Sequence, residues 1–259
     1  MPEYRCILYE RREDAAILTL NTPDGQNRIG REAVEELADA VGRANRDSTV
    51  RAVILTGTGE YFCAGGRIDG FPDGSALEQR EYSDGTVRFQ ETLYRSGKPI
   101  IAAVQGHALA GGLTVVAGCD LAVAAEGAMF GLVELSHGNF PMIALAVNGK
   151  CIPKKRLFEM IYSCVPIDAA TAERWDIVNK VVPAGGVMDA AMDYARMIAK
   201  RSPVAIRYGR QTYAEMVDLP LGQAMTHAKN ALISMLWTED VRESARARNA
   251  GREPKWIGK

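Results

Sequence analysis

Several residues and motifs that mark common functional classes are scarce or missing in this chain of 259 residues. It has only 3 histidines, and its 5 cysteines form no CxxC pair. With no histidine at ligand spacing and an odd cysteine count, the sequence predicts neither a metal site nor a disulfide framework. A reducing cytoplasm is the simplest setting. No GxSxG elbow, Walker loop or HExxH motif occurs, which argues against the enzyme classes built on them.

An excess of charge is also missing. The chain has 31 Lys and Arg residues against 32 Asp and Glu residues, so its formal net charge is −1. Global attraction to nucleic acid or to an anionic membrane is therefore not expected. A polyanionic ligand would have to be bound by a local cluster of basic side chains.

Long hydrophobic segments are few. The first residues carry charges throughout and no apolar run, so no targeting peptide is predicted. Residues 99–119 are uncharged and approach the length of a membrane span, but they include Gln105, His107 and several glycines. We expect a buried strand, a turn and a helix there, with no membrane insertion.

Apolar periodicity places the chain in the α/β class. Strand patterns and helix patterns alternate through the first half, as expected for βαβ-type units around a mostly parallel sheet. Strands are predicted at 6–11, 15–20, 50–56 and 98–104, and helices at 33–44, 87–95 and 113–117. Residues 68–88 read as a polar segment without a pattern.

Helical patterns dominate the C-terminal part. They cover 188–200, 203–216 and 221–248, and the helical third is expected to start at about Ile143. We predict an α/β core over residues 1–195 and a C-terminal helical region over 196–259.

Two glycine-rich turns, each directly after a strand, are the main candidate for a functional site. FCAGG occupies 62–66 and GHALAGG occupies 106–112, and the next short strand leads to Glu134. Two such turns can each aim a backbone N–H at one point, and two donors beside a carboxylate can stabilise and reprotonate an oxyanion. Apolar neighbours of Glu134 suggest partial burial, which would raise its pKa. The alternatives are glycines that only form turns and a glutamate that faces solvent.

These segments resemble the successive signatures of the crotonase superfamily, also called the enoyl-CoA hydratase/isomerase superfamily. The signatures are FCAGG (62–66), GHALAGG (106–112), Cys119-Asp120 and FGLVE (130–134), supported by VRAVILTG (50–57) and REPKW (252–256). The similarity runs from about Ala15 to the end of the chain. It implies a spiral of ββα units and a C-terminal helical region that assembles homotrimers or hexamers. It also implies an acyl-CoA substrate, as in fatty acid metabolism, with coenzyme A present only as part of that substrate.

The resemblance also implies roles for individual residues. Gly66 and Gly111 would supply the oxyanion N–H donors, and Glu134 would transfer the proton. The positions expected to contact the substrate or its CoA part are Asn27, Arg28, Ala64, Arg67, Ile68, His137, Phe140 and Lys255. For the basic residues the alternative is a solvated surface charge, and for His137 and Phe140 it is packing. Arg67 departs from the family, which often has aspartate there.

Thr114 is the more important departure. Classical hydratases have a second glutamate at this position, and here no other acid lies between Lys98 and Cys119. Two carboxylates hold and activate water in hydration, whereas moving a double bond needs one base. Thr114 can hydrogen-bond water or a substrate carbonyl but cannot act as a base. Hydration of a 2-enoyl-CoA, double-bond isomerisation and carbon–carbon chemistry like that of carboxymethylproline synthase stay open, as does a non-catalytic scaffold.

Overall fold

The computed structural model describes residues 4–67 and 75–259, and its strands and helices alternate along the chain. The strands are β1 (Ile7–Arg12), β2 (Ala15–Leu20), β3 (Ala52–Gly57), β4 (Tyr61–Cys63), β5 (Ile100–Val104), β6 (His107–Leu109), β7 (Leu121–Ala125), β8 (Met129–Gly131), β9 (Ile167–Asp168) and β10 (Lys180–Val182). The α-helices are α1 (Arg31–Arg46), α2 (Ala76–Tyr94), α3 (Gly111–Ala117), α4 (Met142–Asn148), α5 (Lys154–Ser163), α6 (Ala169–Arg174), α7 (Val187–Ala199), α8 (Pro203–Met216), α9 (Leu221–Leu236) and α10 (Glu239–Asn249). Short 3-10 helices η1 (Glu134–His137) and η2 (Ala184–Gly186) complete the described elements.

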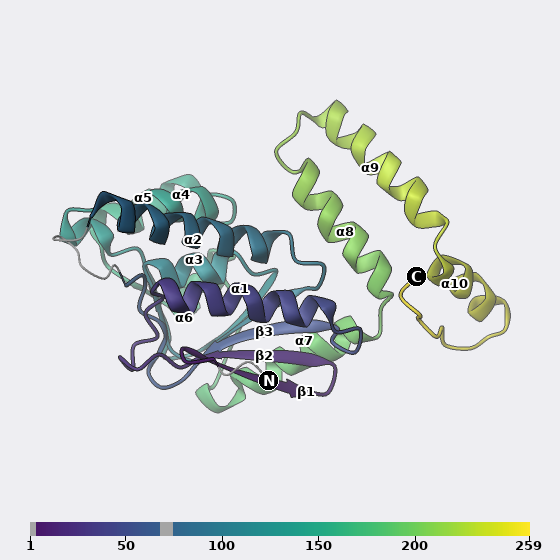
Figure 1. The fold of residues 1–259 in the computed structure, drawn as a ribbon, viewed down its shortest axis with the longest axis horizontal. Coiled ribbons are helices and arrows are strands. Elements are labelled where there is room, and N and C mark those ends of the chain that lie inside the picture. The colour runs from purple at the N-terminus through teal and green to yellow at the C-terminus, as the bar shows by residue number, and fades with distance from the viewer. Residues whose placement is uncertain (1–3, 68–74) are drawn as a thin grey trace.

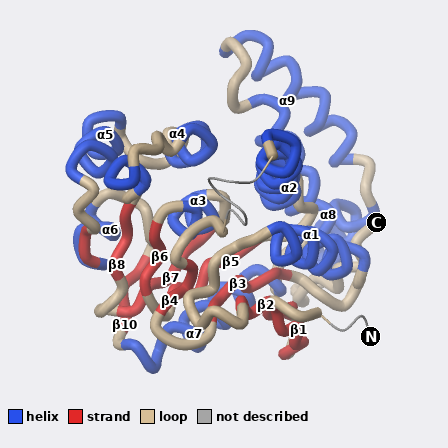
Figure 2. Tube along the Cα trace, turned by 60° about the vertical axis from the view of Figure 1, so that its left-hand side comes forward, coloured by secondary structure: helices blue, strands red, loops and turns tan. Residues whose placement is uncertain are grey.

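The main sheet has the strand order β1-β2-β3-β5-β7-β10. Strand β1 is antiparallel to β2, and the remaining neighbours are parallel, which confirms the predicted mostly parallel sheet. All residues of β3 and β5 are buried, as expected where helices cover both faces. Helix α7 lies on one face, and α1, α2 and α3 lie on the other (Figure 2).

A second, smaller sheet has the order β4-β6-β8-β9. The chain passes from a strand of the main sheet to a short strand of the second sheet and then into a helix. It does so in β3-β4-α2 and β5-β6-α3, and in β7-β8 followed by η1 and α4. This repeated ββα unit confirms the spiral that the resemblance implied.

The predicted run at 99–119 is confirmed as strand, turn and helix. It forms β5, β6 and α3, and these elements are largely buried in the core. Within 4–67 and 75–259, no helix is long and apolar enough to cross a membrane.

Helix α2 is longer than the sequence pattern indicated. The prediction placed a helix at 87–95, but α2 begins at Ala76 with a capping box between Ser75 and Glu78. Only Gly85, Phe89 and Leu93 are buried along α2, so the apolar periodicity of its first half is weak. The capping box was the available signal for the true start.

The C-terminal part also differs in detail from the prediction. Strands β9 and β10 follow Ile143, so the region from that residue is not purely helical. The helix expected at 221–248 is two helices, α9 and α10, separated at Trp237 and Thr238. The predicted boundary at 195–196 falls inside α7, which packs against β3, β5 and β7.

Helices α8 and α9 form an antiparallel hairpin that extends from the core (Figure 1). Arg210 of α8 anchors the hairpin because its guanidinium bonds both carboxylate oxygens of Asp120 at 2.9 to 3.1 Å. The C-terminal segment is held by Asp240, whose carboxylate accepts from Ser202 at 2.6 Å and from the N–H of Ile257 at 2.8 Å.

Candidate active site

The two glycine-rich turns contact each other. Ile29 N–H donates to Gly65 O at 2.9 Å and Arg67 N–H donates to Ile29 O at 3.0 Å, as in a parallel bridge. This pairing directs the N–H of Gly66 away from Ile29. Gly111 lies close to Gly66: a Cβ atom added to Gly111 would be only 3.3 Å from the backbone nitrogen of Gly66. The predicted meeting of the two turns is therefore present in the fold.

Gly111 is the first residue of α3, so its N–H has no partner within the helix. In the described part of the chain, the N–H groups of Gly66 and Gly111 also donate to no other backbone acceptor. Both donors are thus available to a ligand oxygen.

Unusual backbone geometry positions the second donor. Ala110 precedes it with φ 51° and ψ −123°, a conformation that costs energy for a residue with a Cβ. A hydrogen bond of 2.7 Å from Ala110 N–H to Gly131 O holds this residue. At Gly112 a Cβ would come within 2.1 Å of Cys63 O, so glycine is required where the turns pack. The surrounding fold therefore fixes the direction of the N–H groups before any ligand binds.

Glu134 lies at the same edge of the second sheet. Leu109 of β6 pairs with Gly131 of β8, and Glu134 follows as the first residue of η1. Its Oε2 is buried and has no hydrogen-bond partner among the residues described. Burial raises the pKa of the Glu134 carboxyl, while backbone hydrogen bonds and the charge of His137 oppose the rise. A carboxylate with one buried oxygen that lacks a partner and with a raised pKa is suited to proton transfer.

Thr114 lies one turn after Gly111 on α3 and is buried. Its hydroxyl accepts a hydrogen bond of 3.1 Å from Asn148 Nδ2 and is 3.4 Å from Ala110 O. No sequence signal pointed to Asn148, which ends the largely apolar helix α4. This asparagine is fully buried beside the position where classical hydratases have a second acid.

Tyr82 is another neighbour of the turns that the sequence did not predict. Its hydroxyl donates to Ile29 O at 3.1 Å, and a Cβ on Gly66 would lie 2.3 Å from the same hydroxyl. Residues 68–88 show no apolar pattern in the sequence, so no signal there points to Tyr82.

Asn27 has a structural task in the fold. It is fully buried with φ 54°, and its Nδ2 donates to Thr58 O at 2.9 Å and to Tyr61 O at 2.7 Å. Its Oδ1 accepts from Thr22 N–H at 3.3 Å. The Asn27 side chain thus links its own loop, which also contains Ile29, to the segment that leads into the first glycine-rich turn. Both hydrogens of its side-chain amide are already donated. Direct contact with CoA stays a prediction.

The remaining predicted contacts near the turns vary in exposure. Arg28, Arg67 and His137 are exposed, and Ala64 and Phe140 are half-buried. The His137 ring pairs with Ser136 Oγ at 3.1 Å. Ile68 lies outside the described residues. The exposed arginines flank the paired loops at Ile29 and Gly66 and can meet an anionic ligand there.

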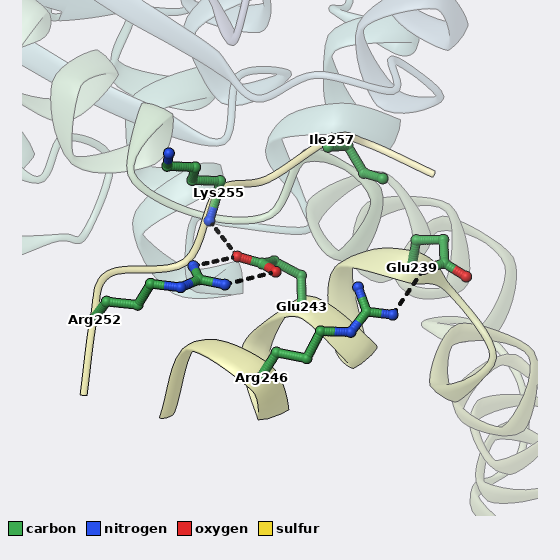
Figure 3. Close-up of a pocket in the computed structure, with 6 residues that line it drawn as sticks. All are labelled: Glu239, Glu243, Arg246, Arg252, Lys255 and Ile257. Carbon is green, nitrogen blue, oxygen red and sulfur yellow. Dashed lines mark hydrogen bonds and ion pairs between the residues drawn. The ribbon is translucent and has the colours of Figure 1, made fainter. Parts of the chain in front are cut away.

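Lys255 lies elsewhere in the chain. It lines a surface pocket of about 380 Å³ beside α10, with its backbone N–H donating to Glu243 at 2.9 Å (Figure 3). The nearby Trp256 bonds Lys200 O, and Arg51, which precedes β3, bonds Arg201 O. This segment therefore lies at the edge where β3 begins, whereas the two glycine-rich turns follow the ends of strands. Within one chain, the structure does not bring Lys255 to the predicted site.

Metal-ligand clusters are not found in the described part of the chain, where no group of three or more His, Cys, Asp or Glu residues could hold a metal ion.

Comparison with known proteins places this geometry in a family. The family model for enoyl-CoA hydratase/isomerase matches residues 10–259. An enoyl-CoA hydratase of Mycobacterium tuberculosis is 30% identical over 96% of this chain and 95% of its own length. A mevalonyl-coenzyme A hydratase of Aspergillus fumigatus is 32% identical over 93% of this chain and 90% of its own length.

Solved structures agree in fold. An enoyl-CoA hydratase subunit from Geobacillus kaustophilus superposes with a TM-score of 0.89 at 31% identity, covering 99% of this chain and 100% of that one. An enoyl-CoA hydratase from Bacillus anthracis gives a TM-score of 0.90 at 27% identity, covering 98% of this chain and 100% of that one. The paired glycine-rich turns, the ββα spiral and these matches across nearly the whole length lead to one conclusion: the chain belongs to the enoyl-CoA hydratase/isomerase family of the crotonase superfamily.

Proposed function

We propose that this protein hydrates a 2-enoyl-CoA through an enolate held by the N–H groups of Gly66 and Gly111. The observation that carries the proposal is the contact between these two turns, with Glu134 and its buried Oε2 at the same sheet edge. Hydratases among the matched relatives support the same reaction.

The reaction can be written with one acid–base residue. The oxygen of a water molecule bonds to C3 while the C2=C3 electrons shift toward the thioester, and the charge collects on the thioester oxygen. Glu134 accepts a proton from the water and then delivers it to C2. The net change is addition of H and OH across the double bond, and Glu134 returns to its carboxylate form.

The two backbone donors supply the electrostatic part of the catalysis. They are directed before the substrate arrives, so little reorganisation accompanies charge development. Removal of one such donor typically costs about 3 kcal/mol in transition-state stabilisation. The thioester makes the α-proton acidic, so the proposed chemistry calls on no redox group or metal ion.

The CoA part of the substrate would be bound by local basic residues, because the net charge of the chain is only −1. Arg28 and Arg67 are the candidates near the turns, since guanidinium groups pair well with phosphate oxygens. Titration calorimetry with CoA and short acyl-CoAs tests this step. Absence of binding below millimolar concentration would contradict the acyl-CoA assignment.

Double-bond isomerisation is the second candidate. It is favoured by Thr114, which leaves Glu134 as the acid beside the turns, because one base can move a proton between C4 and C2. Ultraviolet absorbance of the conjugated enoyl thioester separates the two reactions. Hydration of a 2-enoyl-CoA lowers this absorbance, and isomerisation of a 3-enoyl-CoA raises it. A panel of acyl-CoAs with no change in either direction would favour carbon–carbon chemistry or a scaffold.

Homo-oligomer formation through the C-terminal helices is part of the proposal. Helix α9 has no buried residue in the single chain, and several large apolar side chains on it are exposed. They are Leu221, Met225, Leu232, Ile233 and Leu236. Several exposed large apolar side chains on one helix are typical of a subunit interface. Light scattering would distinguish a trimer or hexamer from a monomer, and a cytoplasmic location stays a prediction.

A further inference from the structure

We propose that Asn148 and Thr114 together hold the water that adds to the double bond, so that a neutral pair takes the place of a second carboxylate. The inference rests on the proposed hydration and adds a new residue, Asn148, to it. Its basis is the hydrogen bond between these two buried side chains and the unpartnered oxygen that Asn148 retains.

The orientation of the Asn148 amide is set by its neighbours. Nδ2 donates to Ala144 O at 2.9 Å and to Thr114 Oγ1 at 3.1 Å. Rotating the amide by half a turn would place Oδ1 against the carbonyl of Ala144, two acceptors facing each other. Oδ1 therefore stays on the opposite side, where it is buried without a partner among the described residues.

A buried amide oxygen without a partner is unusual in a folded protein, because the lost hydrogen bond with water is not replaced. The side chain of Asn148 is 0% exposed, so bulk solvent does not satisfy it. An enclosed water or a ligand group that donates a hydrogen bond is the simplest partner. The asparagine therefore has an open acceptor and contacts Thr114, which lies one turn after Gly111 on α3.

Thr114 supplies the matching donor. Its oxygen already accepts from Asn148, so its own proton is directed elsewhere. The available carbonyl, Ala110 O, is 3.4 Å away and also accepts the Thr114 N–H at 3.3 Å. Because a bond of this length is weak, a closer acceptor would draw the hydroxyl proton. The two contacting residues thus offer one weakly engaged donor and one acceptor without a partner among the described residues.

In the proposed arrangement a water molecule lies between this pair and Glu134. Its oxygen accepts from the Thr114 hydroxyl, and its two protons are donated to Asn148 Oδ1 and to Glu134. One lone pair is left to attack C3. The Glu134 carboxylate also has a buried oxygen without a partner among the residues described. Thr114 follows Gly111 by one turn of α3. Ala110, just before Gly111, donates to Gly131 O, and Glu134 follows Gly131 by three residues. The start of α3 and the residues before Glu134 therefore meet at one edge of the second sheet.

The same donor and acceptor would also fit a hydroxyl group on the acyl chain. Two activities separate the possibilities. One is hydration of crotonyl-CoA, which needs the water. The other is exchange of the α-protons of butyryl-CoA with D2O, which needs Glu134 and the oxyanion donors but no water addition. Exchange is read by mass spectrometry, and hydration by absorbance.

Asn148→Leu keeps the approximate shape of the side chain and removes both polar atoms. We expect it to lower kcat for hydration about ten- to hundredfold, with little change in KM or in the rate of α-proton exchange. Thr114→Val should behave in the same way, and Thr114→Ser should retain more hydration than Thr114→Val because it keeps the hydroxyl. Circular dichroism and CoA titration would check the fold of each variant.

Three results would overturn the inference. Equal losses of hydration and exchange would assign Asn148 a purely structural role. Unchanged crotonyl-CoA hydration, with weaker binding of a hydroxylated enoyl-CoA, would assign the pair to the substrate hydroxyl. Unchanged kinetics for both substrates would assign it no role in the reaction. If the unmodified protein exchanges α-protons but hydrates no enoyl-CoA, the proposed function itself fails.

Discussion

The substitution Gly111→Ala should disable the oxyanion site without unfolding the protein. Gly111 does not have a positive φ, so alanine can adopt its backbone conformation. The added methyl would lie 3.3 Å from Gly66 N, 3.5 Å from the carbonyl carbon of Gly65 and 3.6 Å from its Cα. These contacts are tight but do not overlap, so a shift of a few tenths of an ångström would relieve them.

The functional cost of this shift is larger than its structural cost. An oxyanion donor is effective only within about 2.7 to 3.1 Å of the ligand oxygen, so moving the turns apart lengthens at least one of the two bonds. The methyl also stands beside the N–H of Gly66, where the thioester oxygen must approach. Loss of one donor predicts a fall in kcat of about 10² to 10³.

The measurement is the initial rate of enoyl-CoA turnover with saturating substrate, together with titration calorimetry for CoA. CoA affinity should change little, because the nucleotide is expected to bind outside the turns. Gly127→Ala is a matched control, since a Cβ at Gly127 would meet no atom within 4 Å and its φ is not positive. It should leave both turnover and binding unchanged.

Near-normal turnover in a folded Gly111→Ala variant would refute the assignment of the oxyanion site to these turns. Gly112→Ala is a useful contrast, because its methyl would lie 2.1 Å from Cys63 O and backbone would have to move. That variant should lower thermal stability as well as activity.

Three further predictions concern the acid–base residue and the helical hairpin. Glu134→Gln keeps the size of the side chain but removes its basic lone pair. Calorimetry should therefore still detect acyl-CoA binding, while turnover falls about 10²-fold or more. Normal turnover would place the chemistry elsewhere. His137→Ala removes a charge that lowers the pKa of Glu134. That pKa should therefore rise, and the acidic limb of the pH profile of kcat/KM should move to higher pH. An acidic limb that does not move would contradict this coupling. Ile233 on α9 has a side chain that is 50% exposed. The substitution Ile233→Lys should reduce the mass of the oligomer in light scattering while the helix content is retained. An unchanged mass would exclude this face of α9 from the interface.

Local patterns were sufficient for most of the core. Strands such as β2 and β3 and helix α8 were predicted within a few residues, because buried strands are continuous apolar runs and the residues of α8 show a helical pattern. The glycine turns at Gly66 and Gly111 were also predicted, since glycines directly after strands report close backbone packing. Helix α2 was predicted only in part because few of its residues are buried.

Relations between distant segments were decided only by the tertiary structure. Thr114 and Asn148 are separated by 34 positions and meet because α3 and α4 pack together. Tyr82 reaches Gly66 only through the packing of α2, and Lys255 is carried to the opposite edge of the sheet by the C-terminal helices. The unpaired oxygens of Asn148 and Glu134 likewise depend on what surrounds them in three dimensions. Residue types along the chain determine which donors, acceptors and acids exist, whereas packing decides which of them share one site and which are left without a partner.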